Sequence, residues 1–192
     1  MIVIEARRLS RLVEQLLDLS RLEAGAVEPR ADWVSIDEAL AGAIESLDRP
    51  PETFRLSVPH DLPLVRADGG QLERAFANVL ENAARHSGGH PVSVRARAVG
   101  SRVLVRIVDR GPGIPRAQRR RVFEPFYRAG TDESGHRGSG LGLAIARGLV
   151  TVNGGRIWVE SLAGQGATFA IEFPLEPARS AEPAEAVPEP SR

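Results

Sequence analysis

The sequence predicts an α+β fold, a two-layer α/β sandwich in which helices cover one face of a mixed sheet, preceded by part of a helical hairpin. Apolar residues recur at helical spacing in several segments, and most of the expected strands follow one another as hairpins. Regular alternation of strand and helix, which would indicate a parallel sheet, is absent. We expect three parts: a helical segment at 1–27, the sandwich domain at 28–175 and a disordered tail at 176–192.

The composition excludes several functions. Lys and Arg together number 25, as do Asp and Glu, so net charge gives no reason to expect nucleic acid or an anionic membrane as a partner. The chain has no cysteine, which excludes disulfides, thiolate catalysis and Cys-ligated zinc and fits a reducing compartment such as the cytoplasm. No apolar run approaches the roughly 20 residues that cross a bilayer.

The N-terminal segment predicts a helix over residues 5–23, ended by Gly25 and Pro29. Its apolar positions recur at spacings of three and four: Leu9, Leu12, Val13, Leu16, Leu17 and Leu19. The opposite face mixes acidic and basic residues, whereas a membrane-surface helix would be biased toward Lys and Arg. The stripe therefore favours another helix as its partner, with packing on the same domain as the alternative.

The remaining elements follow in order along the chain. A short strand at 33–36 precedes Ser35 and Glu38, which predict a capping box for a helix to about Leu47. Further helices are expected at 71–85 and 141–152. Further strands are expected at 54–58, 64–66, 92–99, 102–108, 156–160 and 167–173. Residues 127–140 have the composition of a mobile loop, and 176–192 repeat Pro and Glu without a hydrophobic period, as disordered segments do.

Three separated features indicate a binding site. Asn78 and Asn82 lie one turn apart on a helix, where amide oxygens could coordinate a hard cation, although two surface asparagines would look the same. Asp109 ends a strand next to two glycines. A carboxylate there could accept a hydrogen bond from an exocyclic amine while a flat ring approaches the backbone, or it could form an ordinary turn.

The third feature is a glycine-rich junction before the last helix, Gly138-Ser-Gly-Leu-Gly-Leu. Glycines let the backbone wrap an anion, and a helix N-terminus offers unpaired N–H groups to a phosphate. No Gly-Lys-Ser/Thr follows, so the segment is not a P-loop. It also departs from the dinucleotide fingerprint, because its sixth position is Leu143.

Together and in this order, the segments resemble the conserved boxes of sensor histidine kinases, within the ATPase superfamily that includes gyrase, heat-shock chaperones and mismatch-repair ATPases. The N, G1, F and G2 boxes are matched by NVLENAARHS, DRGPGIP, VFEPFYRAG and RGSGLGLAIARGLV. The likeness runs from about Trp33 to Pro174, and GATFAIEFP is similar to the last strand of the family.

The resemblance implies that the cofactors are ATP and Mg²⁺. Asn82 would hold the metal, with Asn78 lining the same site. Asp109 would accept the adenine amino group, joined through water by Thr168, above a floor formed by Gly111 and Gly113. The other implied ATP-binding residues are a phosphate contact, a ring stacked on adenine, two anchors of the ATP lid, and the lid hinge with its phosphate cradle: Arg85, His86, Phe123, Phe126, Gly138, Gly140, Leu141 and Gly142.

The resemblance also bears on hydrolysis. Gyrase and the chaperones resemble one another in placing a glutamate one turn before the metal-binding asparagine, where it activates water. Asn78 occupies that position here, so a general base for fast hydrolysis is missing, which suits an enzyme that transfers the γ-phosphate to a protein. Glu81 is an unfavourable substitute, because it lies about 100° around the helix from Asn82.

The acceptor histidine of the family is not found on the N-terminal helix. The four histidines lie elsewhere: His60, His86, His90 and His136. Residues 5–25 instead resemble the second helix of the dimerisation hairpin. We therefore expect a kinase module that phosphorylates an acceptor-histidine helix in trans for relay to a response regulator. It would dimerise through its N-terminal helix and derive from a membrane-anchored parent.

Two alternatives remain. One is a truncated nucleotide-binding or dimerisation module without phosphotransfer activity. The other is a serine kinase of the anti-sigma type, against which the N-terminal helix argues.

Overall fold

The structure is a computed structural model that describes residues 2–128 and 139–175. The predictions for the tail at 176–192 and for most of the loop at 127–140 lie outside this part of the chain. The helices are α1 (Ile2–Glu23), α2 (Ile36–Glu45), α3 (Gly69–His86) and α4 (Gly142–Val152). Three short 3₁₀ turns span Pro51–Thr53, Arg116–Gln118 and Arg121–Phe123. No helix among the described residues is long and apolar enough to pass through a membrane.

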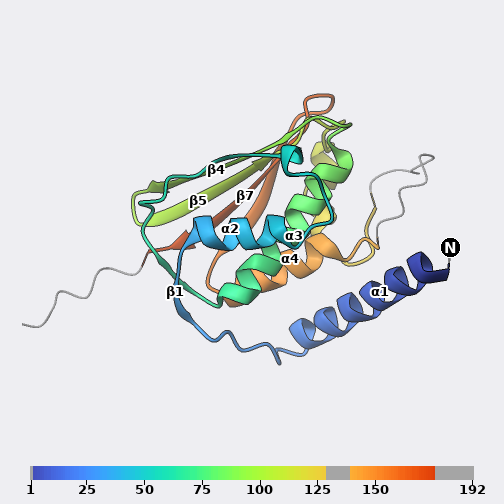
Figure 1. Ribbon diagram of the computed structural model, residues 1–192, viewed down its shortest axis with the longest axis horizontal. Helices are drawn as coiled ribbons and strands as arrows, with labels where there is room; N and C mark the ends of the chain where they lie inside the picture. Colours follow the sequence, from blue (N-terminus) through green and yellow to red (C-terminus); the bar gives the residue numbers. More distant parts are fainter. Residues whose placement is uncertain (1, 129–138, 176–192) are drawn as a thin grey trace, which may run out of the picture.

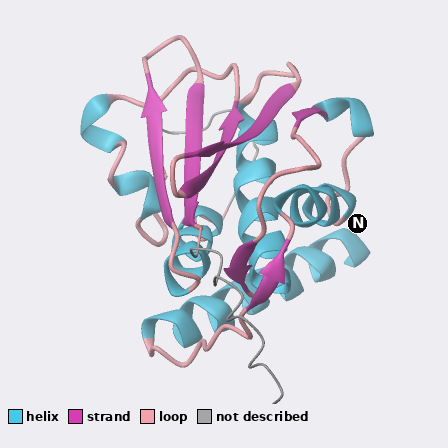
Figure 2. Ribbon diagram, turned by 90° about the vertical axis from the view of Figure 1, so that its left-hand side faces the viewer, coloured by secondary structure: helices cyan, strands magenta, loops and turns pink. Residues whose placement is uncertain are grey.

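The main sheet has five strands in the order β2-β4-β5-β7-β6. Their bounds are β2 (Phe54–Ser57), β4 (Val92–Val99), β5 (Arg102–Val108), β6 (Arg156–Ser161) and β7 (Ala167–Pro174). Strand β2 pairs with β4 in parallel and the other neighbours are antiparallel, which confirms a mixed sheet. The remaining strands, β1 (Asp32–Val34) and β3 (Val65–Ala67), form a separate antiparallel ribbon, visible apart from the main sheet in Figure 2.

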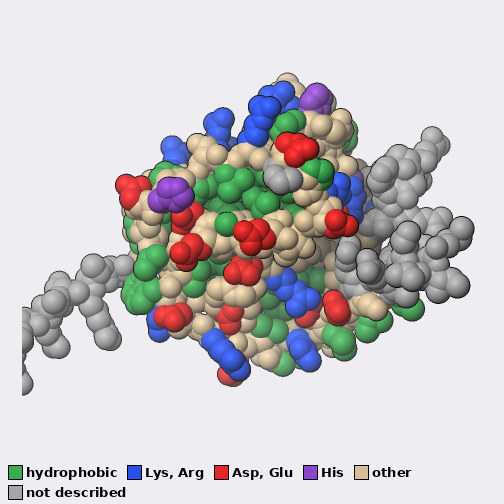
Figure 3. Space-filling model, viewed as in Figure 1, with side chains coloured by type: hydrophobic (Ala, Val, Ile, Leu, Met, Phe, Trp, Pro, Cys, Tyr) green, Lys and Arg blue, Asp and Glu red, His purple; other side chains and the backbone are tan. Residues whose placement is uncertain are grey.

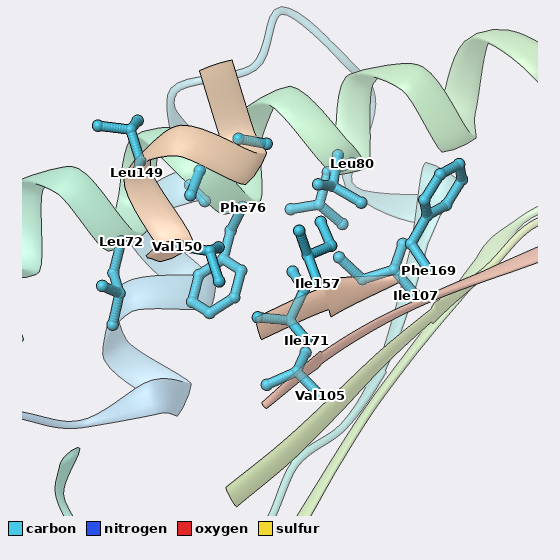
Figure 4. Packing of buried hydrophobic residues seen from close by; sticks show 14 of the residues in the cluster. Leu72, Phe76, Leu80, Val105, Ile107, Leu149, Val150, Ile157, Phe169 and Ile171 are labelled. Carbon is cyan, nitrogen blue, oxygen red and sulfur yellow. The ribbon is translucent and has the colours of Figure 1, made fainter. Parts of the chain in front are cut away.

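Helices α2, α3 and α4 cover one face of the sheet, as the sequence predicts (Figure 1). Leu72, Phe76 and Leu80 lie on the inner side of α3 and are fully buried (Figure 4). The alternate residues of β5 and β7 that point toward the helices complete the layer: Val103, Val105, Ile107, Phe169, Ile171 and Phe173. Burying each large side chain stabilises the fold by about 1.5–3 kcal/mol, so this layer holds α3 firmly against the sheet.

The helix starts are only partly as expected. Asp68 caps α3 by accepting a hydrogen bond from the Gln71 backbone N–H at 3.0 Å. Ser35 does occupy the N-cap of α2, but its side chain makes no capping bond and donates instead to the Asp37 carboxylate. The predicted capping box between Ser35 and Glu38 is therefore wrong, because the hydroxyl bonds the Asp37 carboxylate and not a backbone N–H of the helix.

Helix α1 lies alongside α4, joined to β1 by residues 24–31 (Figure 1). Leu19 is buried against the domain, and the Leu22 side chain packs on Gly148 of α4. Of the other leucine and valine positions of the stripe, Leu12 is half-buried and the remaining four are exposed: Leu9, Val13, Leu16 and Leu17. One edge of the stripe thus packs on the chain's own domain, while its centre remains uncovered.

The charged side chains are mixed over the surface that Figure 3 shows, with acidic and basic groups interspersed over the helical layer. Several form ion pairs, such as Arg102–Glu172 and Arg106–Glu160 on the opposite face of the sheet. This mixture agrees with the equal numbers of acidic and basic residues in the sequence.

Candidate functional site

One cavity lies where α3, the end of β5, the start of β7 and the region before α4 meet. It contains about 860 Å³, counting space open to solvent, which is within the range of small-molecule sites. We call it the main cavity; its lining residues are Asn82, Arg85, His86, Asp109, Pro112, Gly113, Ile114, Val122, Tyr127, Arg128, Gly140, Leu143, Ala167 and Phe169. Three segments that the sequence singled out separately therefore meet at one site.

Asp109 is the most deeply buried charged group in the main cavity, with 3% of its surface exposed. Its Oδ1 accepts hydrogen bonds from the backbone N–H groups of Gly111 at 2.8 Å and Ala167 at 3.0 Å. Within the described part of the chain, Oδ2 has no hydrogen-bond partner. One carboxylate oxygen is thus fixed by the backbone, and the other is available to a donor on a ligand.

The environment of Asp109 also changes its acidity. Burial raises the pKa of the Asp109 carboxyl above its ordinary value. The two backbone N–H groups and the charge of His86 act in the opposite direction but offset the burial only in part. A carboxylate that is costly to ionise and has one open oxygen is a strong acceptor for a hydrogen bond from a ligand.

A second hollow adjoins the main cavity and shares six of its residues, Asn82, Arg85, Val122, Tyr127, Gly140 and Leu143. We call it the side groove; it adds Gln15, Asn78, Glu81, Ser139 and Gly142. The start of α4 forms one wall, and α4 has no side-chain cap at its N-cap residue, Leu141. The groove therefore combines amide side chains, an arginine and a helix N-terminus, which are groups that bind phosphate and its counter-ion.

The two asparagines have different surroundings. Asn78 donates from Nδ2 to the Arg74 carbonyl at 3.0 Å, which orients its side chain along α3. Its Oδ1 lies so close to Gly142 that a Cβ there would be 3.1 Å away. Asn82 is half-buried, makes no hydrogen bond within the described residues and lines both hollows. Asn82 is therefore the amide that is free to hold a ligand, and Asn78 sets the distance between α3 and α4.

Glu81 also reaches the side groove, but it is engaged. It pairs with Arg49 at 3.0 Å and with Arg85 at 3.2 Å. Burial alone would raise the pKa of Glu81, yet the hydrogen bonds and charges of the two arginines outweigh it and lower the pKa. A carboxylate held ionised between two guanidinium groups is a poor proton acceptor, which argues against Glu81 as a general base.

The two phenylalanines of the F-box segment behave differently. Phe123 is 4% exposed and meets Phe169 edge to face, with ring centroids 6.4 Å apart. Phe126 is 63% exposed and has a positive φ of 62°. Phe123 is therefore packed in the core beside the main cavity. The Phe126 side chain is exposed, and its backbone N–H donates to the Gly140 carbonyl at 3.0 Å. Residues 129–138 of the lid lie outside the described residues, so the anchoring role of the two side chains stays a prediction.

The glycines expected at the site fall into distinct places. Gly113 lines the main cavity. Gly111 does not line it, but its backbone N–H donates a hydrogen bond to Asp109 Oδ1. Gly140 has a φ of +74°, and a Cβ there would be 2.9 Å from the Phe126 carbonyl carbon, so only glycine fits comfortably. Gly142 begins α4, directly after its N-cap Leu141. Gly138 lies outside the described residues.

Thr168 does not line either hollow. Successive residues of a strand point to opposite faces, and Thr168 shares the outer face of the sheet with Val108 and Glu160. Its neighbour Ala167 faces the main cavity instead. The role expected for Thr168 is therefore wrong, since the pleat directs its side chain away from the site.

Several residues of the site were not predicted from the sequence. Tyr127 and Val122 line both hollows, and Gln15 reaches the side groove from α1. Gly166 has a φ of +80°, and a Cβ there would lie 2.1 Å from the Asp109 carbonyl oxygen. The glycine spacing at residues 164–166, just before the last strand, is the signal that could have indicated this close approach.

These features define a nucleotide-binding domain: a mixed sheet under three helices, with a buried carboxylate at one end of a cavity and paired amides beside a helix N-terminus at the other. Residues 67–177, more than half of the chain, match the family described as histidine kinase-, DNA gyrase B-, and HSP90-like ATPase. This match covers the main cavity and all of the side groove except Gln15.

Named relatives agree. Sensor protein KdpD of Escherichia coli (strain K12) is 34% identical over 175 residues, which are 90% of this chain and 20% of that protein. Sensor-like histidine kinase SenX3 of Mycolicibacterium smegmatis is 34% identical over 182 residues, which are 91% of this chain and 47% of that protein. The chain thus spans about a fifth to a half of the length of these two relatives.

Solved structures agree as well. Full-length ShkA in complex with AMPPNP is 33% identical with a TM-score of 0.74, and the match covers 87% of this chain and 36% of that one. The mycobacterial sensor histidine kinase MprB is 33% identical with a TM-score of 0.65, and the match covers 75% of this chain and 97% of that one. The chain therefore belongs to the sensor histidine kinases and contains their catalytic, ATP-binding domain.

Proposed function

We propose that this chain binds ATP together with Mg²⁺ and donates the γ-phosphate to a histidine on an acceptor helix supplied in trans, for relay to a response regulator. One observation carries the proposal. The open oxygen of Asp109 and the free amide of Asn82 stand in one continuous pair of hollows, which the start of α4 borders. An adenine ring at Asp109 would direct its phosphates toward Asn82 and α4.

The residues at the inner end of the site, around Asp109, suit adenine. The amino group of adenine is a hydrogen-bond donor, and Oδ2 of Asp109 is an acceptor without a partner among the described residues. His86 lines the same cavity, where its ring can stack on the base, and Gly113 leaves room for a flat ligand. Guanine presents a carbonyl oxygen at the position of the adenine amine, so Asp109 would disfavour it.

The residues at the outer end of the site, around Asn82, suit magnesium. Mg²⁺ prefers oxygen ligands and is usually held by few protein side chains together with water and substrate phosphates. No group of three or more His, Cys, Asp or Glu side chains able to hold a metal occurs in the described ranges. Asn82 would hold the ion through its amide oxygen, and the bound ion would neutralise phosphate charge. Arg85 lines both hollows and adds positive charge to the same end.

The surroundings of Asn82 favour transfer over hydrolysis. The position one turn earlier carries Asn78, an amide that cannot accept a proton. The nearest carboxylate on α3, Glu81, is bound by Arg49 and Arg85. Among the described residues, water therefore lacks a positioned base, which favours keeping the phosphoryl group for a protein nucleophile.

The proposed function also implies two protein partners, a second copy of the chain and a response regulator. Exposed Leu9, Val13, Leu16 and Leu17 on α1 form an apolar surface that a second copy of α1 would cover in a homodimer. One relative bears the name signal transduction histidine-protein kinase AfsQ2, from Streptomyces coelicolor, which supports a response regulator as recipient. We place the module in the cytoplasm, as part of a membrane-anchored parent.

Phosphotransfer is tested by incubating the full chain with γ-labelled ATP and a separate helical hairpin that bears the acceptor histidine. Label should appear on the hairpin and not on this chain. Two controls are needed: a hairpin with the histidine changed to glutamine, and the Asn82→Ala chain, both of which should stay unlabelled. If ATP binds but the hairpin remains unlabelled under every condition, the chain is a nucleotide-binding module without transferase activity.

A further inference from the structure

A hydrogen-bonded chain connects α1 to the phosphate end of the site. Ser139 Oγ donates to Gln15 Oε1 at 2.8 Å, across 124 positions of sequence. The same Ser139 Oγ accepts a hydrogen bond from the Leu141 backbone N–H at 3.2 Å. A hydroxyl has one proton to donate, so Gln15 fixes the direction in which Ser139 offers its lone pairs. Gln15 thereby holds Ser139 over the start of α4.

This arrangement occupies a group that a phosphate would use. Leu141 is the N-cap of α4, and the first N–H groups of a helix have no partner within the helix. Anions bind at such positions because the free N–H groups point toward them. With Ser139 bound to the Leu141 N–H, a phosphate must displace the hydroxyl to gain that donor.

The position of Gln15 is itself fixed by two further contacts on the same side of α1. Asp18 forms an ion pair with Arg74 of α3, and Leu22 packs on Gly148 of α4. Gln15, Asp18 and Leu22 are spaced by three and four residues and so lie on one helix face. The docked face of α1 thus carries a polar contact, an ionic contact and an apolar contact in succession.

We propose that Gln15 is a positioning residue that acts through Ser139, and that docked α1 lowers the affinity of the side groove for the phosphates of ATP. This inference rests on the proposed function and adds regulation to the same site. Release of α1 frees Ser139 to rotate and returns the Leu141 N–H to the ligand. By thermodynamic linkage, ATP binding must weaken the docking of α1 to the same extent.

The test compares ATP with adenosine, which lacks phosphates, on the full chain by titration calorimetry. Gln15→Ala should bind ATP about five-fold more tightly, the size of one modest hydrogen bond, and should bind adenosine unchanged. Ser139→Ala should show the same gain, and adding Gln15→Ala to it should give no further gain. Ser20→Ala, an exposed change on the same helix, is the matched control and should resemble the unaltered chain.

Hydrogen exchange supplies an independent readout. Exchange of the α1 amides near residues 15–22 should speed up when ATP is added and should not respond to adenosine. If the unaltered chain binds adenosine and ATP but Gln15→Ala binds ATP equally or more weakly, the positioning role of Gln15 is disproved and the proposed function is unaffected. If the unaltered chain does not bind ATP, the proposed function and the positioning role of Gln15 are both disproved.

Discussion

Asp109 and Ala167 are joined by two hydrogen bonds in opposite directions. The Asp109 N–H donates to the Ala167 carbonyl at 2.9 Å, and the Ala167 N–H donates to Asp109 Oδ1 at 3.0 Å. The start of the last strand therefore orients a carboxylate 58 positions earlier in the chain. This reciprocal pair occupies Oδ1 and leaves Oδ2, which has no partner among the described residues, available to a base in the main cavity.

Asp109→Asn should weaken ATP binding by about ten-fold or more, because an amide N–H would replace the acceptor that meets the adenine amine. The amide oxygen can still accept from Gly111 and Ala167, so the fold should be retained. Thermal unfolding of the ligand-free variant should begin no earlier than that of the unaltered chain, since burial makes the native charge costly. Unchanged ATP affinity in calorimetry would disprove the adenine contact.

The raised pKa of Asp109 predicts a pH dependence. As pH falls through this raised pKa, the carboxyl gains a proton and ceases to be a pure acceptor, so ATP affinity should fall at a higher pH than for an ordinary aspartate. The effect on stability has the opposite sign. A folded-state pKa above the unfolded value contributes stability below the unfolded pKa, and this is lost as pH rises through the folded pKa. Titrations of Asp109→Asn should lack both effects.

Asn82→Ala should remove the magnesium-dependent part of ATP binding, because the variant loses the amide oxygen that lines both hollows. Measured with ATP in magnesium and in a chelator, the unaltered chain should differ between the two conditions, whereas the variant should not. Adenosine, which needs no metal, serves as the control for folding and should bind both proteins alike. A magnesium response that survives in Asn82→Ala would place the ion elsewhere.

Gly166→Ala should destabilise the chain by about 1–3 kcal/mol and weaken adenosine binding, because the added Cβ meets the Asp109 carbonyl. Gly164→Ala is a matched control: its φ is +78° against +80° for Gly166, but no atom lies within 4 Å of the added Cβ. Chemical denaturation of both variants separates the cost of backbone conformation from that of the clash. Equal losses in the two variants would show that contact with Asp109 is unimportant.

The exposed stripe on α1 predicts association of chains. Leu16→Glu should shift sedimentation toward the monomer, since a charge would have to be buried in the helix interface. Leu64→Glu alters a residue that is equally exposed, 46% in both cases, but does not belong to α1, and it should not change the oligomeric state. A monomeric unaltered chain whose α1 amides resist hydrogen exchange would contradict dimerisation through this helix.

Local patterns predicted most elements of the fold. The hairpin of β4 and β5 lies at its predicted residues, since strict alternation over a long run leaves little freedom of register. The pairing of β1 with β3 was not predicted, because three-residue strands carry almost no periodic signal. The capping box at Ser35 was not found because the hydroxyl donates to the Asp37 carboxylate instead of accepting from a backbone N–H of α2, and sequence spacing alone does not rank these two partners.

The site residues that belong to sequence motifs were predicted, whereas those that are placed by tertiary contacts were not. Asp109 and Asn82 line the cavity as the family resemblance implies. Thr168 was misplaced although strand alternation from buried Phe169 already directs it outward. The exposure of Phe126 follows from a left-handed backbone that no local pattern announces. Gln15 could not be found at all, because its place depends on how α1 docks across the domain.

The eight residues between α1 and β1, Ala24 to Ala31, act as a tether. So short a connection keeps the effective local concentration of α1 near its docking face in the millimolar range. At such a concentration, even a contact as weak as one hydrogen bond decides how much of the time the helix is bound. A change in tether length or stiffness would therefore retune the response to ATP while every residue of the pocket stayed the same.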